Sequence, residues 1–144
     1  MGVSRRQFLA NSATTAVGAS AALWIPTAHA ASGQNVAPSD TIVIGAIGVN
    51  GMGFTDLRSL LRLDGVECGA LCDVDNAVLQ RRVGEIDEIT GRKPKAYGNY
   101  RELLEDDDID AVVIGTPDHW HCLQMVDACA AGKDVYVEKP CSHN

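Results

Sequence analysis

The chain has 144 residues, and its 19 acidic residues outnumber its 12 Lys and Arg residues, which gives a net charge of −7. An acidic domain does not attract nucleic acid or an anionic membrane surface, so neither is expected as a partner. The length is enough for one globular domain beside a targeting segment.

Residues 1–30 have the pattern of an export signal. Residues 4–9 read SRRQFL, with a twin-arginine pair, and an uncharged stretch rich in Ala and Thr follows. The Ala-His-Ala sequence at 28–30 is the small-x-small pattern that precedes cleavage by a signal peptidase. The apolar stretch is shorter than the roughly 20 residues of a membrane span, and Pro26 interrupts it. We therefore expect export through the twin-arginine pathway, to the periplasm or otherwise out of the cytoplasm, and no stable membrane span after cleavage.

Residues 31–40, ASGQNVAPSD, are small and polar and predict a linker. The continuous apolar run at 41–47 is typical of a parallel strand that is buried on both faces. A glycine loop at 48–53 follows this strand. Phe54, Leu57, Leu60 and Leu61 then recur at the spacing of a helix.

The alternation of strand and helix continues to the end of the chain. Strands are predicted at 66–72, 95–97, 109–115 and 134–137, and helices at 76–90, 99–105 and 119–131. Asn99 is typical of a helix N-cap, and Gly91 and Gly132 are typical of helix ends. The pattern predicts an α/β fold over residues 41–144, a doubly wound parallel sheet of Rossmann type. We expect the strand order 3-2-1-4-5, with a ligand crevice between the first and fourth strands, where the order reverses.

The sequence holds five cysteines, and an odd number leaves at least one thiol unpaired within the chain. Cys122 and Cys129 fall on the apolar face of the helix at 119–131, which predicts small buried side chains. The acidic run at 105–108 lies between a helix and a strand and predicts a solvated turn. We expect no metal site.

The first loop reads Gly48-Val49-Asn50-Gly51-Met52-Gly53. A dinucleotide fingerprint needs a tight turn, a close approach of backbone to the pyrophosphate, and free N–H groups at a helix N-terminus. Gly48 and Gly53 match its first and third glycines. Asn50 takes the second position and tolerates a positive φ better than most residues, while Gly51 can supply the close approach.

Asp73 ends the second predicted strand, 20 residues after the last glycine of the loop. A carboxylate at this place can accept both hydrogen bonds of an adenosine ribose diol, and it repels a 2′-phosphate. It therefore favours NAD over NADP as the cofactor. The alternative is a helix N-cap, a part that Asp75 can also play.

The fourth strand ends in Thr116-Pro117-Asp118-His119-Trp120-His121, and the fifth ends in Glu138-Lys139-Pro140. The glycine loop, the Cys-Asp-Val-Asp stretch at 72–75, and these two stretches resemble the Gfo/Idh/MocA family of oxidoreductases in their order. The resemblance covers residues 41–144. The Trp between two histidines, and Cys-Ser-His-Asn at the chain end, look like the exported branch of that family.

The resemblance implies a role for each matching residue. The pyrophosphate loop would comprise Gly48, Asn50, Gly51, Met52 and Gly53, and Asp73 would hold the adenosine ribose. The wall beside the nicotinamide ribose would comprise Thr116, Pro117 and His121. Lys139, next to Glu138, would lie near the nicotinamide and the reacting carbon, where it helps bind cofactor and substrate and assists proton movement, and His121 is a second candidate catalytic residue. The Lys139–Pro140 peptide is often cis in the family.

Hydride transfer needs a nicotinamide held against a substrate carbon. The resemblance therefore implies the NAD-binding half of an exported oxidoreductase that acts on a sugar or polyol. A glycosidase is the alternative, since some exported relatives use bound NAD to oxidise a sugar transiently, eliminate the aglycone, add water and reduce the sugar again. Full members continue into a second α/β domain with the substrate pocket and often form homo-oligomers. We expect this chain to be a fragment that binds cofactor without turnover.

Overall fold

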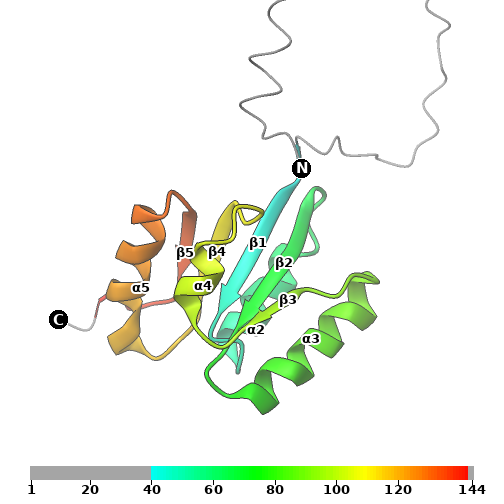
Figure 1. Ribbon diagram of the computed structural model, residues 1–144, viewed down its shortest axis with the longest axis horizontal. Coiled ribbons are helices and arrows are strands. Elements are labelled where there is room, and N and C mark those ends of the chain that lie inside the picture. Colours follow the sequence, from blue (N-terminus) through cyan, green and yellow to red (C-terminus); the bar gives the residue numbers. More distant parts are fainter. Residues whose placement is uncertain (1–39, 143–144) are drawn as a thin grey trace, which may run out of the picture. The chain divides into compact units, whose positions relative to one another are not determined.

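The computed structural model describes residues 40–142 (Figure 1). The predicted export signal and residues 31–39 of the predicted linker lie outside the described residues. Within residues 40–142, no helix is long and apolar enough to cross a membrane.

A five-stranded parallel sheet forms the centre of the fold, in the order β3-β2-β1-β4-β5. This is the predicted order. The strands are β1 (Ile42–Ile47), β2 (Val66–Cys72), β3 (Lys95–Tyr97), β4 (Ala111–Ile114) and β5 (Asp134–Val137). Strand β4 is shorter than the predicted 109–115, because the N–H of Ile109 bonds within the preceding turn, to the carbonyl of Asp106.

Four helices connect these strands: α2 (Met52–Leu60), α3 (Asn76–Thr90), α4 (Tyr100–Leu104) and α5 (Asp118–Ala130). Asp75 caps α3, because its side chain accepts hydrogen bonds from the N–H groups of Ala77 and Val78. Asn99 caps α4 in the same way, as predicted. Helix α3 ends at Gly91, whose φ of 69° lies in the left-handed region that glycine favours.

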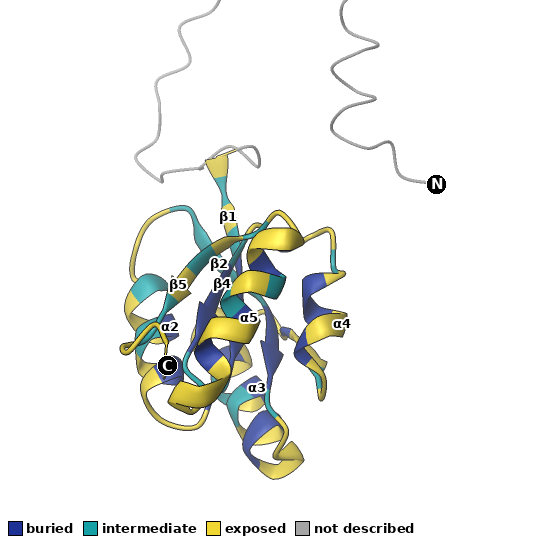
Figure 2. Cartoon of the chain, turned by 90° about the vertical axis from the view of Figure 1, so that its left-hand side faces the viewer, coloured by how far each residue is buried: buried dark blue, intermediate teal, exposed yellow. Residues whose placement is uncertain are grey.

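The sheet has a core on each face, and alternate residues of a strand contribute to different cores. Ile44 and Ala46 of β1 pack with apolar residues of α2 and α3. Ile47 of β1 belongs to the opposite core, with residues of α4 and α5. Figure 2 shows buried residues on the strands and exposed ones along the outer sides of the helices. Both faces are covered, which is why β1 is a nearly continuous apolar run.

One prediction about side-chain surroundings is wrong, and a second is wrong in part. Cys122 and Cys129 are exposed, as is Cys141, while Cys72 is buried and Cys68 half-buried. The inward face of α5 carries His121, Gln124 and Ala128 instead. Helix α5 also has apolar residues on its exposed side, Leu123 and Val126. The apolar stripe read from the sequence therefore lies about one position away from the side of the helix that is buried.

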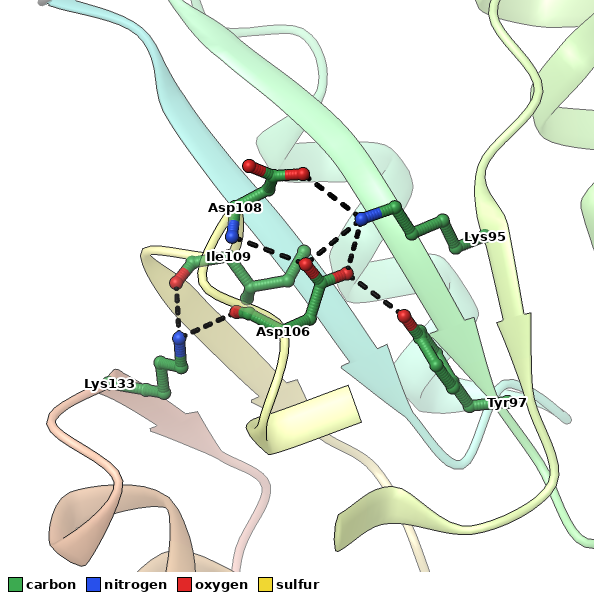
Figure 3. A network of polar contacts seen from close by, with 6 residues as sticks. All are labelled: Lys95, Tyr97, Asp106, Asp108, Ile109 and Lys133. Atoms are coloured by element: carbon green, nitrogen blue, oxygen red, sulfur yellow. Dashed lines mark hydrogen bonds and ion pairs between the residues drawn. The ribbon is translucent and has the colours of Figure 1, made fainter. Parts of the chain in front are cut away.

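The second prediction, a solvated turn at 105–108, holds for Glu105, Asp107 and Asp108, which are exposed, but not for the Asp106 carboxylate. The Asp106 side chain is 8% exposed and accepts hydrogen bonds from Lys95 Nζ and Tyr97 Oη, while Lys133 Nζ donates to the carbonyls of Asp106 and Ile109 (Figure 3). Burial acts to raise the pKa of Asp106, but hydrogen bonds from Lys95, the Asp108 N–H and Tyr97 lower it below its usual value. These contacts tie the turn to β3 and to Lys133, which precedes β5.

Candidate functional site

A cavity of about 590 Å³ opens at the carboxyl ends of the strands, within the range of small-molecule sites. Strand β1 and its loop contribute Ile47, Gly48 and Asn50 to the wall, and the end of β2 with the residues after it contributes Cys72, Asp73 and Val74. The other wall residues are Gly98–Arg101, Gly115–Pro117, Trp120 and Gln124. The cavity therefore lies across the neighbouring strands β1 and β4, where the order of the sheet reverses. This is where ligands bind in open parallel sheets.

The glycines of the loop allow neighbouring backbone segments to pack closely against each other. A Cβ atom on Gly48 would lie 2.7 Å from the Thr116 backbone nitrogen, and one on Gly53 would lie 2.2 Å from the Gly48 carbonyl oxygen. Among residues 40–142 only glycines have a positive φ. Asn50 therefore does not adopt the positive φ expected at its position, whereas Gly51 has a φ of 115°. The N-cap Gly51 has no side chain to bond the first N–H groups of α2.

Asp73 lines the cavity, and its carboxylate is already bonded on both oxygens. Oδ2 accepts from the N–H of Val49 at 2.9 Å, and Oδ1 accepts from the N–H of Asp75 at 3.0 Å. Each carboxylate oxygen has a second lone pair, so the group can still accept hydrogen bonds from a ligand diol. The sequence missed the contact with the glycine loop, which links the ends of β1 and β2.

Thr116 and Pro117 line the cavity as predicted, and Gln124 joins them. The Thr116 hydroxyl donates to Oε1 of Gln124 at 2.7 Å. Gln124 is 4% exposed. Burying an amide costs free energy unless the amide is hydrogen-bonded, so this contact stabilises the buried side chain. The bond leaves the lone pairs of the Thr116 oxygen available to a ligand. The one available signal for Gln124 was its position three residues after His121, on the same side of α5.

His121 lies inside the protein and does not line the cavity, which differs from the expectation that its ring faces the cofactor. Its side chain is 1% exposed, with Nδ1 2.7 Å from the Pro140 carbonyl oxygen and Nε2 2.7 Å from the Thr116 carbonyl oxygen. Both ring nitrogens are thus occupied by the loops that follow β4 and β5. In the described structure the imidazole holds these two loops together.

Lys139 and Glu138 follow β5, and neither lines the cavity. Lys139 is exposed, and its peptide bond to Pro140 is cis. The Glu138 N–H bonds the Ile114 carbonyl, which continues the pairing of β5 with β4. Asp56 of α2 is affected by this stretch, because burial and then the charge of Glu138 raise the pKa of Asp56.

The loop residues Gly51, Met52 and Gly53 lie at the start of α2 and directly follow Asn50, which lines the cavity.

The cavity includes residues that the sequence did not single out, chiefly Tyr100 and Arg101 at the start of α4. Burial, and then the hydrogen bond from its hydroxyl to Asp127, raise the pKa of Tyr100 to about 12. Arg101 pairs with the same Asp127 at 3.3 Å and lies over the Tyr100 ring. These contacts join α4 to α5. The N-cap signal at Asn99 located this helix start but not its place in the wall.

The residues around the cavity fit a dinucleotide. The cavity is surrounded by the tight turn at Gly48, the start of α2, which no side chain caps, and the acid that follows β2. Residues 42–144 match the model of the GFO_IDH_MocA family, described as "Oxidoreductase family, NAD-binding Rossmann fold". The chain belongs to this family. It is an NAD-binding oxidoreductase domain of Rossmann fold.

Curated relatives include "Glycosyl hydrolase family 109 protein 1" of Shewanella sp. (strain ANA-3), 43% identical over 110 residues, which are 73% of this chain and 24% of the relative. "Alpha-N-acetylgalactosaminidase" of Shewanella oneidensis has the same identity and coverage. The chain spans about a quarter of the length of these relatives.

Solved structures give the same fold. Scyllo-inositol dehydrogenase from Lactobacillus casei, with bound NAD(H) and scyllo-inositol, has a TM-score of 0.65 and 27% identity over 72% of this chain and 29% of that one. An NAD-binding oxidoreductase from Klebsiella pneumoniae has a TM-score of 0.63 and 35% identity over 72% of this chain and 28% of that one.

Proposed function

We propose that this chain is the cofactor-binding half of an exported enzyme that transfers hydride between a sugar or polyol and NAD. The observation that carries the proposal is the convergence of the glycine loop, Asp73 and Thr116 on one cavity at the reversal of the strand order. The dehydrogenase with bound NAD(H) and scyllo-inositol supports a polyhydroxylated substrate.

NAD is preferred to NADP in this proposal because of Asp73. Its carboxylate is fixed by the N–H groups of Val49 and Asp75, and a 2′-phosphate beside it would meet a like charge. Arg101 is the one cationic side chain of the cavity wall, and Asp127 already pairs with it. The described wall therefore offers a phosphate no unpaired cation.

Bound NAD supplies a hydride acceptor or donor, and the residues of this chain orient and enclose it. The N–H groups at the start of α2 would hold the pyrophosphate, and Asp73 would accept hydrogen bonds from the adenosine ribose. The Thr116 hydroxyl, which donates to Gln124, would accept a hydrogen bond from the nicotinamide ribose. Lys139, exposed on the loop after β5, is proposed to hold or move the proton of the substrate hydroxyl.

A glycosidase that works by transient oxidation is the second candidate. The relatives at 43% identity, named as glycosyl hydrolase family 109 proteins and as an α-N-acetylgalactosaminidase, support it. In this reaction the same bound NAD would oxidise the sugar, and after loss of the aglycone and addition of water it would return the hydride. The cofactor half would therefore be the same in both candidates.

Calorimetric titration of the 144-residue chain with NAD⁺ and NADP⁺ tests the cofactor proposal. We expect saturable binding of NAD⁺ and at least tenfold weaker binding of NADP⁺, about 1.4 kcal/mol. A folded chain that binds neither nucleotide would remove the proposed function, and equal affinities would remove the preference for NAD.

Two assays on a protein of the relatives' length separate the redox enzyme from the glycosidase. A net dehydrogenase forms NADH in step with oxidation of an inositol or sugar. A glycosidase releases p-nitrophenol from p-nitrophenyl α-N-acetylgalactosaminide with no accumulation of NADH. Lys139→Met should slow either reaction at kcat with little change in NAD⁺ affinity, whereas unchanged turnover would remove the role of Lys139.

Export through the twin-arginine pathway remains part of the proposal and rests on Arg5 and Arg6. Fusion of residues 1–39 to a reporter that is active only after export of a folded protein tests it. Replacement of both arginines by lysine should abolish export of the reporter. Export that persists in this variant, or that is absent with the natural sequence, would contradict the proposal.

A further inference from the structure

We infer that Arg82 of α3 is a positioning residue for cofactor binding, because it fixes the peptide of the glycine loop that faces the pyrophosphate. The inference rests on the NAD-binding role of the domain. Nε of Arg82 donates to the Val49 carbonyl at 3.1 Å, across 33 residues of sequence. Its guanidinium also lies 4.1 Å from the centre of the Phe54 ring, in the first turn of α2. Arg82 thus contacts Val49 and Phe54, the residues that directly precede and follow 50–53.

Val49 is held from two directions. It is 0% exposed, its N–H donates to Oδ2 of Asp73 at 2.9 Å, and its carbonyl accepts from Arg82. The first contact comes from the end of β2 and the second from α3. Together the two contacts hold the peptide groups on both sides of Val49 in the observed orientation.

The consequence for the ligand follows from the planarity of the peptide bond. The carbonyl of Val49 and the N–H of Asn50 belong to one trans peptide and point in opposite directions. With the carbonyl turned to Arg82, the N–H is turned away from α3, and Asn50 itself lines the cavity. Within residues 40–142 this N–H has no hydrogen-bond partner in the protein. It is a donor placed for a phosphate oxygen.

Direct phosphate binding by Arg82 does not account for these contacts. The side chain is 19% exposed and is absent from the described cavity wall. Nη1 donates to both oxygens of Glu85, at 3.0 and 2.8 Å, so an acid already balances its charge. The contact that matters is the donor at Nε, not the charge.

The two functions of the side chain are separable by substitution. Arg82→Gln retains an amide donor at about the place of Nε and loses the charge, whereas Arg82→Met has a similar length and no donor. Arg81→Met is the matched control, since Arg81 lies on the same helix, pairs with the same Glu85 and is 56% exposed. Calorimetric titration of these 144-residue chains with NAD⁺, ADP and adenosine reads out the pyrophosphate contact, because adenosine lacks phosphate.

We expect Arg82→Met to bind NAD⁺ and ADP about three- to tenfold more weakly, the effect of one hydrogen bond, with adenosine affinity unchanged. Arg82→Gln should stay within about twofold of the natural chain, as should Arg81→Met. Equal losses for ADP and adenosine would indicate a general structural defect and overturn the inference. An unchanged NAD⁺ affinity in Arg82→Met, or a full loss in Arg82→Gln, would also overturn it.

If Arg82→Met does not fold, a measurement on the natural chain still tests the inference that the Asn50 N–H is placed for a phosphate oxygen. In ¹⁵N-labelled protein, the amide resonance of Asn50 should shift on addition of ADP and not on addition of adenosine. A resonance that ADP leaves unmoved would overturn the inference. Failure of NAD⁺ to bind the natural chain is a different result and would remove the proposed function itself.

Discussion

The Oδ2 atom of Asp73 lies 2.9 Å from the backbone nitrogen of Val49 and accepts its hydrogen bond. The acid expected to hold the adenosine ribose therefore also anchors the glycine loop. In the proposed function one carboxylate would serve the two halves of an adenosine diphosphate, so its loss should affect both.

Asp73→Asn is expected to weaken NAD⁺ binding about ten- to hundredfold, because the amide turns a donor toward the N–H of Val49 or of Asp75 and loses a charged acceptor. NADP⁺ should lose less, so the preference between the nucleotides shrinks. Calorimetric titration measures both. Asp75→Asn is the control, since it removes the same charge and Asn is also a good N-cap. Equal effects of the two substitutions would contradict a specific role for Asp73.

Gly53→Ala should destabilise the domain by about 1–3 kcal/mol, because the added Cβ would lie 2.2 Å from the Gly48 carbonyl oxygen and 3.0 Å from Gly115 Cα. Backbone cannot yield as a flexible side chain does, so α2 must move from the sheet and NAD⁺ affinity should fall as well. Gly84→Ala, in the interior of α3 with open space around it, should instead stabilise by up to about 1 kcal/mol. Urea denaturation of both variants measures this, and a neutral Gly53→Ala would show that the contact relaxes.

His121→Phe should destabilise the domain by about 1–3 kcal/mol, because it removes the buried ring nitrogens that lie 2.7 Å from the carbonyl oxygens of Thr116 and Pro140. Hydrogen exchange should increase in the loops after β4 and β5, ahead of the rest of the sheet. His119→Phe changes an exposed histidine two residues earlier and should do neither. Unfolding by urea, with hydrogen exchange read by mass spectrometry, tests both effects. Equal stability of the two variants would show that His121 does not join the loops.

Asp106→Asn should lower the free energy of unfolding by about 1.5–3 kcal/mol at neutral pH, since Lys95 and Tyr97 donate to this buried carboxylate. The folded-state pKa of Asp106 lies below its usual value of 3.8, so the contribution is fully present above that pH. It is lost as the pH falls through the folded-state pKa.

The measurement is urea denaturation of both chains between about pH 2 and about pH 7. The two stability curves should converge at the acid end. Asp107→Asn removes an exposed neighbouring charge and should follow the natural chain throughout. A difference that stays constant down to the lowest pH would show that the ionised carboxylate is not the source of the stability.

The sequence by itself determined the fold and the place of the site. Buried parallel strands are continuous apolar runs, and helix ends carry local signals such as Asp75, Asn99 and Gly91, so elements can be read from neighbouring residues. The strand order followed, because right-handed crossovers leave few alternatives. The glycine loop and Asp73 could be placed at one edge, since all parallel strands end there.

Only the tertiary structure decided which side chains face the cavity and which hold it together. Arg82 and Val49 are 33 residues apart, and His121 and Pro140 are 19 apart, so no local pattern links them. Burial of His121 and exposure of Cys122 depend on a small rotation of α5 about its axis, which helical periodicity does not fix. Long-range contacts of polar groups depend on how the helices pack on the sheet, and that packing is set by both cores at once.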